Sequence, residues 1–378
     1  MNDSAPKVLR SIKRHFRPLR DRRVMRTQHH PFINILVMAL CGAICGAEGW
    51  KGLAVFSSAK AEWFATFLDM PKGTPSADTF RRVFSALDPA QFHECFRSWV
   101  GELAGHLRGE VVAVDGKTVR GALASASAKH ALHLLHAWAT GQHLLLGQLA
   151  VEGAAAEISG LVELVKFLDL EGAVVTGDAN FCTAKVTTAI IEKKADYTLC
   201  VKGNRGPLHA FVKELFDNPE HKRQATSALT GEVGHGRTEV REAWTIEPAE
   251  WPESFRHWRH LRTAVMVERE RELNGRVSLE RHYYVTSLSA DADRLLSIVR
   301  SHWGVENGLH WVLDVGFNED RRRIRNQNAA QNYALLTRIA FMMLKRDKLR
   351  AGIALKRQNA GWDPAYLLRL LTSGSVEI

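Results

Sequence analysis

The stretch Val111-Val112-Ala113-Val114-Asp115-Gly116-Lys117 is the strongest fold signal in the chain. Four apolar residues, three of them β-branched, run into an aspartate and a glycine, which predicts a strand buried on both faces that ends at a carboxylate. The stretch Ala173-Val174-Val175-Thr176-Gly177-Asp178 repeats the pattern. Two such strands can set two carboxylates side by side, which is costly unless a cation lies between them. Alternatively, each aspartate only caps a turn or the following helix.

The chain has 378 residues, 46% apolar and 24% charged, which is typical of a globular protein of two or three domains. Its net charge of +10 is gathered at two places. Residues 1–30 carry nine Lys or Arg against two Asp, and residues 319–350 carry nine against three acids. Localised positive charge suits a polyanion, most often nucleic acid, although a solvated basic tail has the same composition.

The five cysteines form no CxxC pair and are odd in number. This argues against a disulfide framework or a structural zinc site and favours a reducing cytoplasm. The apolar run over residues 32–47 is shorter than the roughly 20 residues of a membrane span and lies too far from the N-terminus for a signal peptide. We therefore expect a buried helix there and no membrane association.

Periodicity divides the chain into segments of different pattern, of which the first is a basic arm over residues 1–30. Residues 31–108 repeat apolar positions at helical spacing and predict an all-α N-terminal domain. Residues 109–205 predict elements in the order β-β-β-α-β-α-β, with acids after the first and fourth strands, which is the ribonuclease-H arrangement. We expect a β-rich insertion at 206–285, two helices completing the ribonuclease-H-like domain at 286–345, and a C-terminal tail at 346–378. The fold class is therefore α/β, or α+β overall.

The bounds of the predicted elements follow from the same patterns. The strands are 111–114, 133–139, 144–151, 173–176, 197–201, 237–246, 262–268 and 282–287, and the main helices after residue 108 are 157–168, 184–194, 291–314 and 328–345.

Asp115, Asp178 and Glu306 form the candidate catalytic set. Two strand-end acids and a third from a neighbouring helix can hold two Mg²⁺ or Mn²⁺ ions about 4 Å apart, which activate an attacking hydroxyl and stabilise the departing oxygen. The predicted helix 291–314 puts Glu306 in its middle, where a carboxylate has no capping role. The rival acids are Asp314, near the end of the helix where its dipole disfavours a carboxylate, and Glu319 with Asp320, which we expect to pair with Arg321, Arg322 and Arg323.

Two other chemistries have to be weighed against this set. His302, Glu306 and His310 share a helical stripe and could bind zinc, but metalloprotease histidines are four residues apart and these are eight apart. Cys182 follows Asp178 closely and could look like a nucleophile, yet a buried, inert thiol is the more typical explanation.

Three tryptophans of the insertion, Trp244, Trp251 and Trp258, lie among basic residues. They could stack on an unpaired or flipped base, as aromatic side chains do in single-strand binding. The alternative, favoured for any single one of them, is that they pack in the core of the insertion.

Several motifs then combine into a familiar pattern. They are Asp115-Gly116-Lys117-Thr118-Val119-Arg120-Gly121, Val175-Thr176-Gly177-Asp178-Ala179, Ala195-Asp196-Tyr197-Thr198-Leu199, Lys202-Gly203-Asn204, Gly234-His235-Gly236-Arg237 and His302-Trp303-Gly304-Val305-Glu306-Asn307-Gly308-Leu309-His310-Trp311-Val312-Leu313-Asp314-Val315. This pattern resembles the DDE-type bacterial insertion-sequence transposases, in particular the H-repeat-associated proteins. The resemblance extends from Phe16-Arg17-Pro18-Leu19 to Gly361-Trp362-Asp363.

The resemblance implies a ribonuclease-H-like catalytic domain with a β-rich insertion, preceded by a helical associated domain. It implies that Asp115, Asp178 and Glu306 are the three acids that hold Mg²⁺ or Mn²⁺. The implied activity is cleavage and strand transfer of DNA by a bacterial cytoplasmic protein that acts as a homodimer on element ends and target DNA. A domesticated or decayed copy that binds DNA without cutting it, and a nuclease without strand transfer, are the alternatives.

The chain departs from the family pattern at a few positions, among them Gly153-Ala154-Ala155-Ala156-Glu157, where relatives have Lys-Ser-Asn-Glu, and His302, where broader relatives have Arg. The residues expected to contact DNA are Lys117, Arg120, Lys202, Asn204, Trp244, His302, Asn307, Arg321, Arg322 and Arg323.

Overall fold

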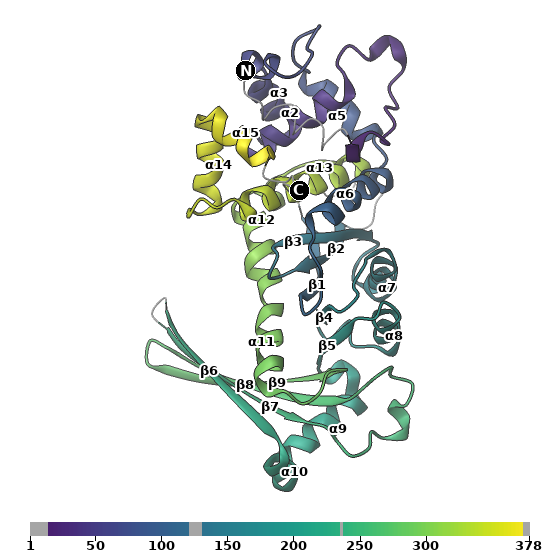
Figure 1. Ribbon diagram of the computed structural model, residues 1–378, viewed down its shortest axis with the longest axis vertical. Helices are drawn as coiled ribbons and strands as arrows, with labels where there is room; N and C mark the ends of the chain where they lie inside the picture. Colours follow the sequence, from purple (N-terminus) through teal and green to yellow (C-terminus); the bar gives the residue numbers. More distant parts are fainter. Residues whose placement is uncertain (1–13, 121–130, 235–236, 373–378) are drawn as a thin grey trace.

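The computed structural model describes residues 14–120, 131–234 and 237–372 as a mixed α/β protein (Figure 1). Helices gather at one end, the first five strands lie in the middle, and four long strands extend from the other end. In the described residues no single helix has the length and apolarity of a membrane span, and the one pair of helices that passes by length and composition together, α2 (Phe32–Ile44) with α3 (Gly49–Ala59), is bent by 100°. The sequence motif at residues 235–236 and residues 1–13 of the basic arm lie outside the described residues.

The N-terminal helices form where the helical periodicity predicts them. They are α2 (Phe32–Ile44), α3 (Gly49–Ala59), α4 (Ala61–Ala65), α5 (Ala77–Ala86) and α6 (Pro89–Leu103), preceded by a short 3₁₀ turn, η1 (Met25–Thr27). The Ser76 hydroxyl caps α5 by accepting the N–H of Thr79, and Asp88 caps α6, whose first residue is a proline. These caps explain why the two helices begin where they do.

The central strands follow the predicted order. β1 (Val111–Val119), β2 (Leu132–Ala139) and β3 (Leu144–Val151) are antiparallel neighbours, and β4 (Val174–Gly177) and β5 (Asp196–Val201) run parallel to β1. The sheet order is β3-β2-β1-β4-β5. Between β3 and β5 come the short 3₁₀ turn η2 (Ala154–Ala156) and the helices α7 (Glu157–Phe167) and α8 (Ala184–Glu192), which lie side by side along one side of the sheet in Figure 1.

β1 is longer than predicted. It continues through Asp115 to Val119 because β2 pairs with it as far as Val119↔Leu132. Asp115 therefore does not end its strand, and it lies instead where the parallel pairing of β1 with β4 stops, after Val114↔Gly177.

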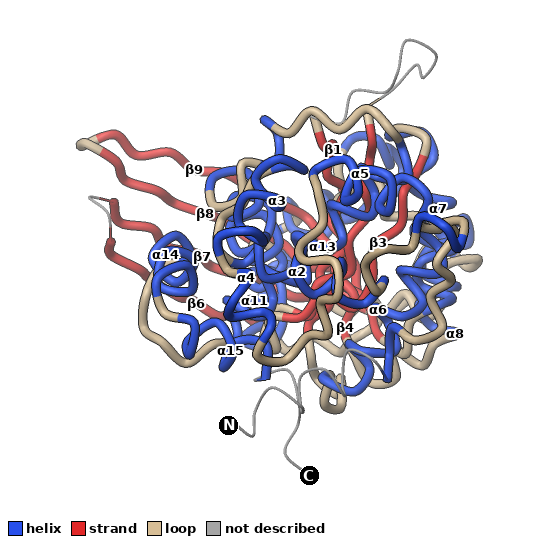
Figure 2. The backbone as a smooth tube through the Cα atoms, turned by 90° about the horizontal axis from the view of Figure 1, so that it is seen from above, coloured by secondary structure: helices blue, strands red, loops and turns tan. Residues whose placement is uncertain are grey.

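The predicted insertion starts with helices that the sequence pattern did not reveal, η3 (Gly203–Arg205), α9 (Gly206–Asp217) and α10 (Pro219–Gln224). The strands β6 (Thr226–Gly234), β7 (Arg237–Ile246), β8 (Thr263–Leu273) and β9 (Arg276–Thr286) follow, with η4 (Glu253–Phe255) between β7 and β8. β9 pairs with β5, so all nine strands form one continuous sheet. Seen from above, β6–β9 project sideways beyond the helices as a ribbon (Figure 2).

The predicted helix over 291–314 is interrupted. It consists of α11 (Ala292–His302), a π-helical turn η5 (Glu306–His310) and α12 (Trp311–Val315). α11 packs against β1, β4 and β5 and also against β6 and β7. After η6 (Glu319–Arg321) comes α13 (Gln327–Arg346), then α14 (Ile353–Trp362) and α15 (Pro364–Thr372). α13 is buried over most of its length and packs against α2, α5, α6, β2 and β3, so it joins the N-terminal helices to the sheet.

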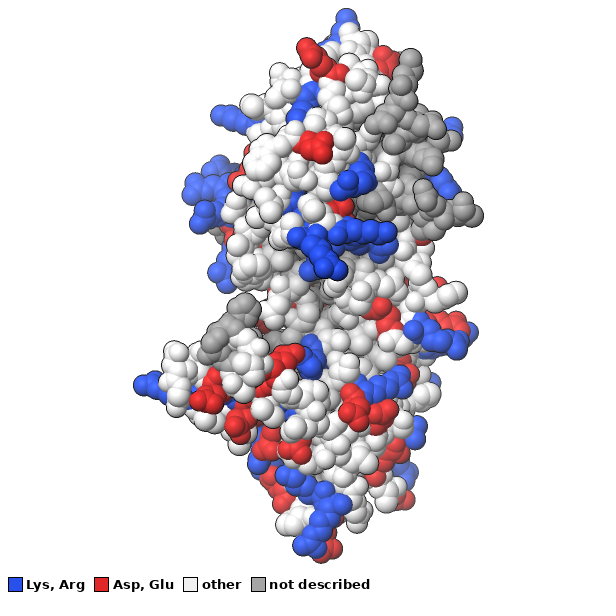
Figure 3. Space-filling model, turned by 60° about the vertical axis from the view of Figure 1, so that its left-hand side comes forward, with Lys and Arg blue, Asp and Glu red and all other residues white. Residues whose placement is uncertain are grey.

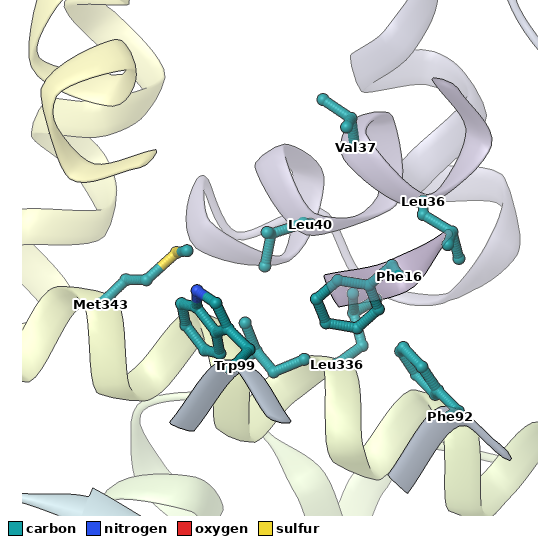
Figure 4. Close-up of a pocket in the computed structure, with 9 residues that line it drawn as sticks. Phe16, Leu36, Val37, Leu40, Phe92, Trp99, Leu336 and Met343 are labelled. Atoms are coloured by element: carbon teal, nitrogen blue, oxygen red, sulfur yellow. The ribbon is translucent and has the colours of Figure 1, made fainter. Parts of the chain in front are cut away.

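A small apolar cavity of about 30 Å³ lies where α2, α6 and α13 meet, with Phe16 over it (Figure 4). Its wall also includes Trp99 and Met343. A space this small and apolar is a packing gap rather than a ligand site.

Candidate functional site

The two predicted aspartates lie at the same level on neighbouring strands. Val114 of β1 is in register with Gly177, the last residue of β4, and Asp115 and Asp178 directly follow them in the chain. Parallel strands in register therefore bring together two acids that are far apart in the sequence.

Asp178 is partly buried, and its pKa is raised above the ordinary value. Burial raises the pKa of Asp178 most, the N–H of Asn180 opposes this shift, and the negative charges of Asp115 and Glu157 raise it further. The Asn180 N–H lies 2.9 Å from the Asp178 Oδ1. Two carboxylates that repel each other in a partly buried place are the arrangement that a divalent cation would stabilise.

Asp115 keeps one side open, since its side chain is 30% exposed. Its Oδ1 accepts the N–H of Gly116 at 2.9 Å, and its Oδ2 lies 3.3 Å from Nδ1 of His310. Each oxygen has one neighbour and retains a lone pair for another ligand.

Glu306 is the first residue of the π-helical turn that ends at His310, and it is exposed. Its carboxylate makes no hydrogen bond or ion pair with another described residue. Within the described ranges no three His, Cys, Asp or Glu residues are close enough to share a metal. The structure therefore brings Asp115 and Asp178 together and leaves Glu306 apart from them. Glu306 lies on the same π-helical turn as His310, which contacts Asp115.

The two histidines beside Glu306 have separate partners. His302 Nδ1 lies 3.0 Å from the Thr176 hydroxyl, and burial lowers the pKa of His302 while the charge of Asp115 opposes this shift. His310 instead contacts Asp115 and His136. Because the two histidines face different partners, they do not support a shared zinc site. The partner of His302 is Thr176, within the protein, and its contact with DNA stays a prediction.

The rival acids are all engaged elsewhere. Asp314 accepts the Lys117 ammonium on both oxygens at 2.7 Å. Glu319 is buried against Arg338, and Asp320 accepts the backbone N–H of Arg120 at 3.1 Å. The prediction that Glu319 and Asp320 pair with the neighbouring arginines is therefore wrong, because both acids bind residues far away in the chain.

Two of the basic residues predicted to contact DNA are occupied inside the protein. Lys117 is buried and its charge is used by Asp314. Arg322 donates to the Thr337 hydroxyl and to the Phe317 carbonyl, and its guanidinium lies over the ring of Tyr333. Both cations thus have partners within the protein, and their contact with DNA stays a prediction.

The remaining candidates face solvent. Asn204 has a structural contact as well, since its Nδ2 donates to the Ala179 carbonyl at 2.9 Å and ties the loop after β5 to the loop that carries Asp178. The other exposed side chains are Arg120, Lys202, Asn307, Arg321 and Arg323.

The insertion tryptophans pack inward, as the alternative prediction holds. Trp251 donates its Nε1–H to the Arg262 carbonyl at 3.1 Å, Trp244 lies under the Lys222 ammonium, and all three pack against the main hydrophobic core. Trp303 and Trp311, on either side of Glu306, are exposed at 41% and 60%, and Trp362 near the other end of the chain is exposed as well.

A cluster that the sequence reasoning missed lies near the acids. His133 Nε2 is 2.7 Å from the Glu157 Oε1, and its Nδ1 is 2.8 Å from the Thr118 hydroxyl. In the sequence Glu157 is only the last residue of a variant motif at the start of a predicted helix. Its burial is visible only in the structure. Cys182 is a buried free thiol whose pKa is raised by burial, as expected of an inert cysteine.

Comparison with known proteins decides the family. The sequence model described as Transposase DDE domain matches residues 106–343, and the one described as DDE_Tnp_1-associated matches residues 13–100. The chain belongs to the DDE transposases. It is 32% identical to the H repeat-associated putative transposase YhhI of Escherichia coli (strain K12), over 97% of this chain and 99% of that protein. It is 33% identical to the putative transposase YncI of Escherichia coli O157:H7, over 92% of this chain and 90% of that protein.

These relatives place the transposase among the H-repeat-associated proteins, as the sequence motifs indicate. Among solved structures, the piggyBac transposase synaptic complex with hairpin DNA covers all of this chain and 80% of its own, at a TM-score of 0.42 and 11% identity. That likeness is too slight to define the fold.

Proposed function

We propose that this transposase binds the ends of its own element, cuts DNA there and joins the freed 3′-hydroxyl to target DNA. The observation that carries the proposal is the register-matched pair Asp115 and Asp178 in a chain of the DDE family. We further propose a ribonuclease-H-like catalytic domain, supported by the strand order β3-β2-β1-β4-β5 with β4 and β5 parallel to β1. The domain limits given in the sequence analysis are part of this proposal.

DDE transposases generally use divalent metal ions, and the donor set here fits Mg²⁺ or Mn²⁺. Asp115 and Asp178 offer carboxylate oxygens only, and burial, with the charges of Asp115 and Glu157, raises the pKa of Asp178, so a bound cation would stabilise its ionised form. Asp115 and Asp178 would hold the ions and Glu306 would complete the set. When bound, the ions would supply activation of the attacking oxygen and stabilisation of the departing one.

The residues of the chain itself would orient the DNA. Arg120, Lys202, Arg321 and Arg323 are exposed cations that we expect to bind backbone phosphates, and Asn307 lies next to Glu306 on the π-helical turn. We expect a homodimer on the two DNA ends, acting in the bacterial cytoplasm because its substrate lies there.

The test is incubation with DNA from the flanks of the element, with Mg²⁺ or with EDTA. Asp115→Asn, Asp178→Asn and Glu306→Gln should each abolish Mg²⁺-dependent cleavage while retaining binding to end DNA. Asp314→Asn is the rival control. If Glu306→Gln cuts DNA normally and Asp314→Asn does not cut, the third metal-binding acid is Asp314.

A copy that binds DNA without cutting it is the second candidate, and the absence of a three-residue metal cluster among the described residues favours it. It predicts that the wild-type protein binds end DNA equally well with Mg²⁺ and with EDTA and never cuts it.

A further inference from the structure

A series of buried side chains leads from the interior of the protein to Asp115. At its inner end Arg338 of α13 is held by Glu319, and both side chains are fully buried. Arg338 Nη2 donates to Glu319 Oε2 at 3.0 Å, and Nη1 donates to Oε1 and to the Ala334 carbonyl. Arg338 Nε lies 3.1 Å from Nε2 of His136.

The arginine decides which nitrogen of His136 carries a hydrogen. Arginine stays protonated in proteins, so its Nε–H always donates and His136 Nε2 must accept. Burial, followed by the charge of Arg338, holds the pKa of His136 well below its ordinary value, so the ring is neutral. Its single hydrogen is therefore on Nδ1, which faces His310 Nε2 at 3.3 Å.

The same reasoning extends to His310. Its Nε2 must accept from His136, so its hydrogen is on Nδ1, which lies 3.3 Å from Asp115 Oδ2. A second hydrogen on Nε2 of His310 would face the Nδ1–H of His136, two donors against each other. Lys117 also lies near His136, but its ammonium donates to Asp314 and not to the histidine.

We propose that His310 is a positioning residue for Asp115, and that Glu319, Arg338 and His136 fix its tautomer. The inference rests on the proposed function, in which Asp115 is a metal ligand. The Nδ1–H of His310, 3.3 Å from Oδ2, would orient the Asp115 carboxylate and leave the other oxygen available to a metal ion. Hydrogen-bonded partners of this kind commonly set the orientation and affinity of metal ligands.

The buried ion pair is itself an argument for such a role. Two charges removed from water lose solvation that their mutual attraction seldom outweighs, so apolar residues of the same volume would stabilise the core at least as well. A pair that fixes a hydrogen-bond direction is useful for a different reason, since an arginine cannot reverse its donors.

The first test reads the tautomers directly. In protein labelled with ¹⁵N-histidine, long-range proton–nitrogen spectra should show Nδ1–H for both His136 and His310, with the signals assigned by His136→Asn and His310→Asn. An Nε2–H tautomer at either residue would overturn the proposal. This measurement needs neither DNA nor activity.

The second test measures binding of Mn²⁺ alone by electron paramagnetic resonance. His310→Leu should weaken Mn²⁺ binding by about 10–100-fold. His310→Asn, whose amide nitrogen can occupy the place of Nδ1, should recover binding to within about threefold of wild type. His15→Leu is the matched control, because it removes another buried histidine, bonded to Ser98 and Glu102, and should leave the metal affinity unchanged.

The outcomes separate this proposal from the proposed function. Loss of Mn²⁺ binding in Asp115→Asn with unchanged binding in His310→Leu would overturn the positioning role and leave the function standing. Equal weakening in His310→Leu and His310→Asn would also overturn it, because the donor would then be irrelevant. Unchanged Mn²⁺ binding in Asp115→Asn would instead refute the metal site of the proposed function.

Discussion

The charge of Asp178 lowers the stability of the folded protein. Asp178 has a raised pKa in the folded protein, so ionising it costs more there than in the unfolded chain. The resulting loss of stability sets in as the pH rises through the unfolded pKa and is complete above the folded one. Such a cost to stability is common at residues kept for activity, the role proposed for Asp178.

We therefore expect Asp178→Asn to raise the free energy of unfolding at pH 7, on the order of 1 kcal/mol. The gain should disappear below about pH 3.8, where the aspartate is protonated in both states. Urea unfolding at several pH values measures it. Asp169→Asn, at an exposed position, is the control and should change stability by less than about 0.5 kcal/mol. A gain that persists at low pH would assign the effect to packing.

The buried ion pair of Glu319 and Arg338 also makes the stability depend on pH. Despite burial, the charge of Arg338 holds the pKa of Glu319 below its ordinary value, so this contribution to stability is present above the unfolded pKa and lost as the pH falls through the folded one. Arg338→Met alone should destabilise the protein by about 3–5 kcal/mol, because it leaves a buried charge unpaired. Glu319→Leu with Arg338→Met should restore most of the stability without restoring wild-type Mn²⁺ affinity. Restored affinity in the double variant would show that the pair serves the fold alone.

At the scale of elements, the sequence predicts what periodicity controls. Buried strands such as β3, with identical predicted and observed bounds, carry a continuous apolar signal. β6 was missed because nearly all its residues are exposed, which leaves no alternation to read. The sequence does not reveal the break in the long helix at Glu306–His310, because a single turn with i→i+5 hydrogen bonds has no composition of its own.

The contacts that shape the site were beyond prediction for another reason. Lys117 and Asp314 are 197 residues apart, and no local pattern relates a strand residue to a later helix. Asp115 and Asp178 were found because each follows its own strand signal. The histidines behind Asp115 were not, because their roles depend on which elements pack together.

The tryptophans of the β6–β9 ribbon and of the helix near Glu306 allow a test at this scale. Trp251→Ala should lower the free energy of unfolding by about 2–4 kcal/mol, since it removes an inward-packed ring and the hydrogen bond to Arg262. Trp311→Ala, at an exposed ring, should change it by less than about 0.5 kcal/mol. Thermal and urea unfolding of both variants measures the two changes. A stable Trp251→Ala variant would contradict the packing described here and reopen base stacking in the ribbon.

Over the whole molecule, charge is distributed unevenly. On the face in Figure 3, acidic and basic side chains intermingle over the lower half, while Lys and Arg predominate in clusters over the upper half. Ion pairs also join acidic and basic side chains across β8 and β9, for example Arg281 with Glu268 and Arg269 with Glu280. Neutralised pairs of this kind contribute little to the attraction of DNA.

The described part of the basic arm is not a loose tail. Phe16 and Leu19 are buried in the main core, and Arg23 is bound to Asp21 and to the His30 carbonyl. Deleting the arm would therefore disturb the fold as well as remove charge. Arg17 and Arg20 are exposed and form no ion pair with another described residue, so they are the better probes of DNA attraction.

We expect the double variant Arg17→Gln and Arg20→Gln to keep its thermal stability and to bind DNA with a weaker dependence on salt. Each phosphate contact contributes about −0.9 to the slope of log K against log salt on duplex DNA, so the slope should flatten by up to about 1.8. Arg256→Gln, an exposed arginine paired with Glu253 near the ribbon, is the control and should leave the slope unchanged. Titrations of end DNA at several salt concentrations measure both. An unchanged slope in the double variant would show that this arm packs against the helices without touching DNA, and that the positive charge around residues 319–350 has to supply the attraction.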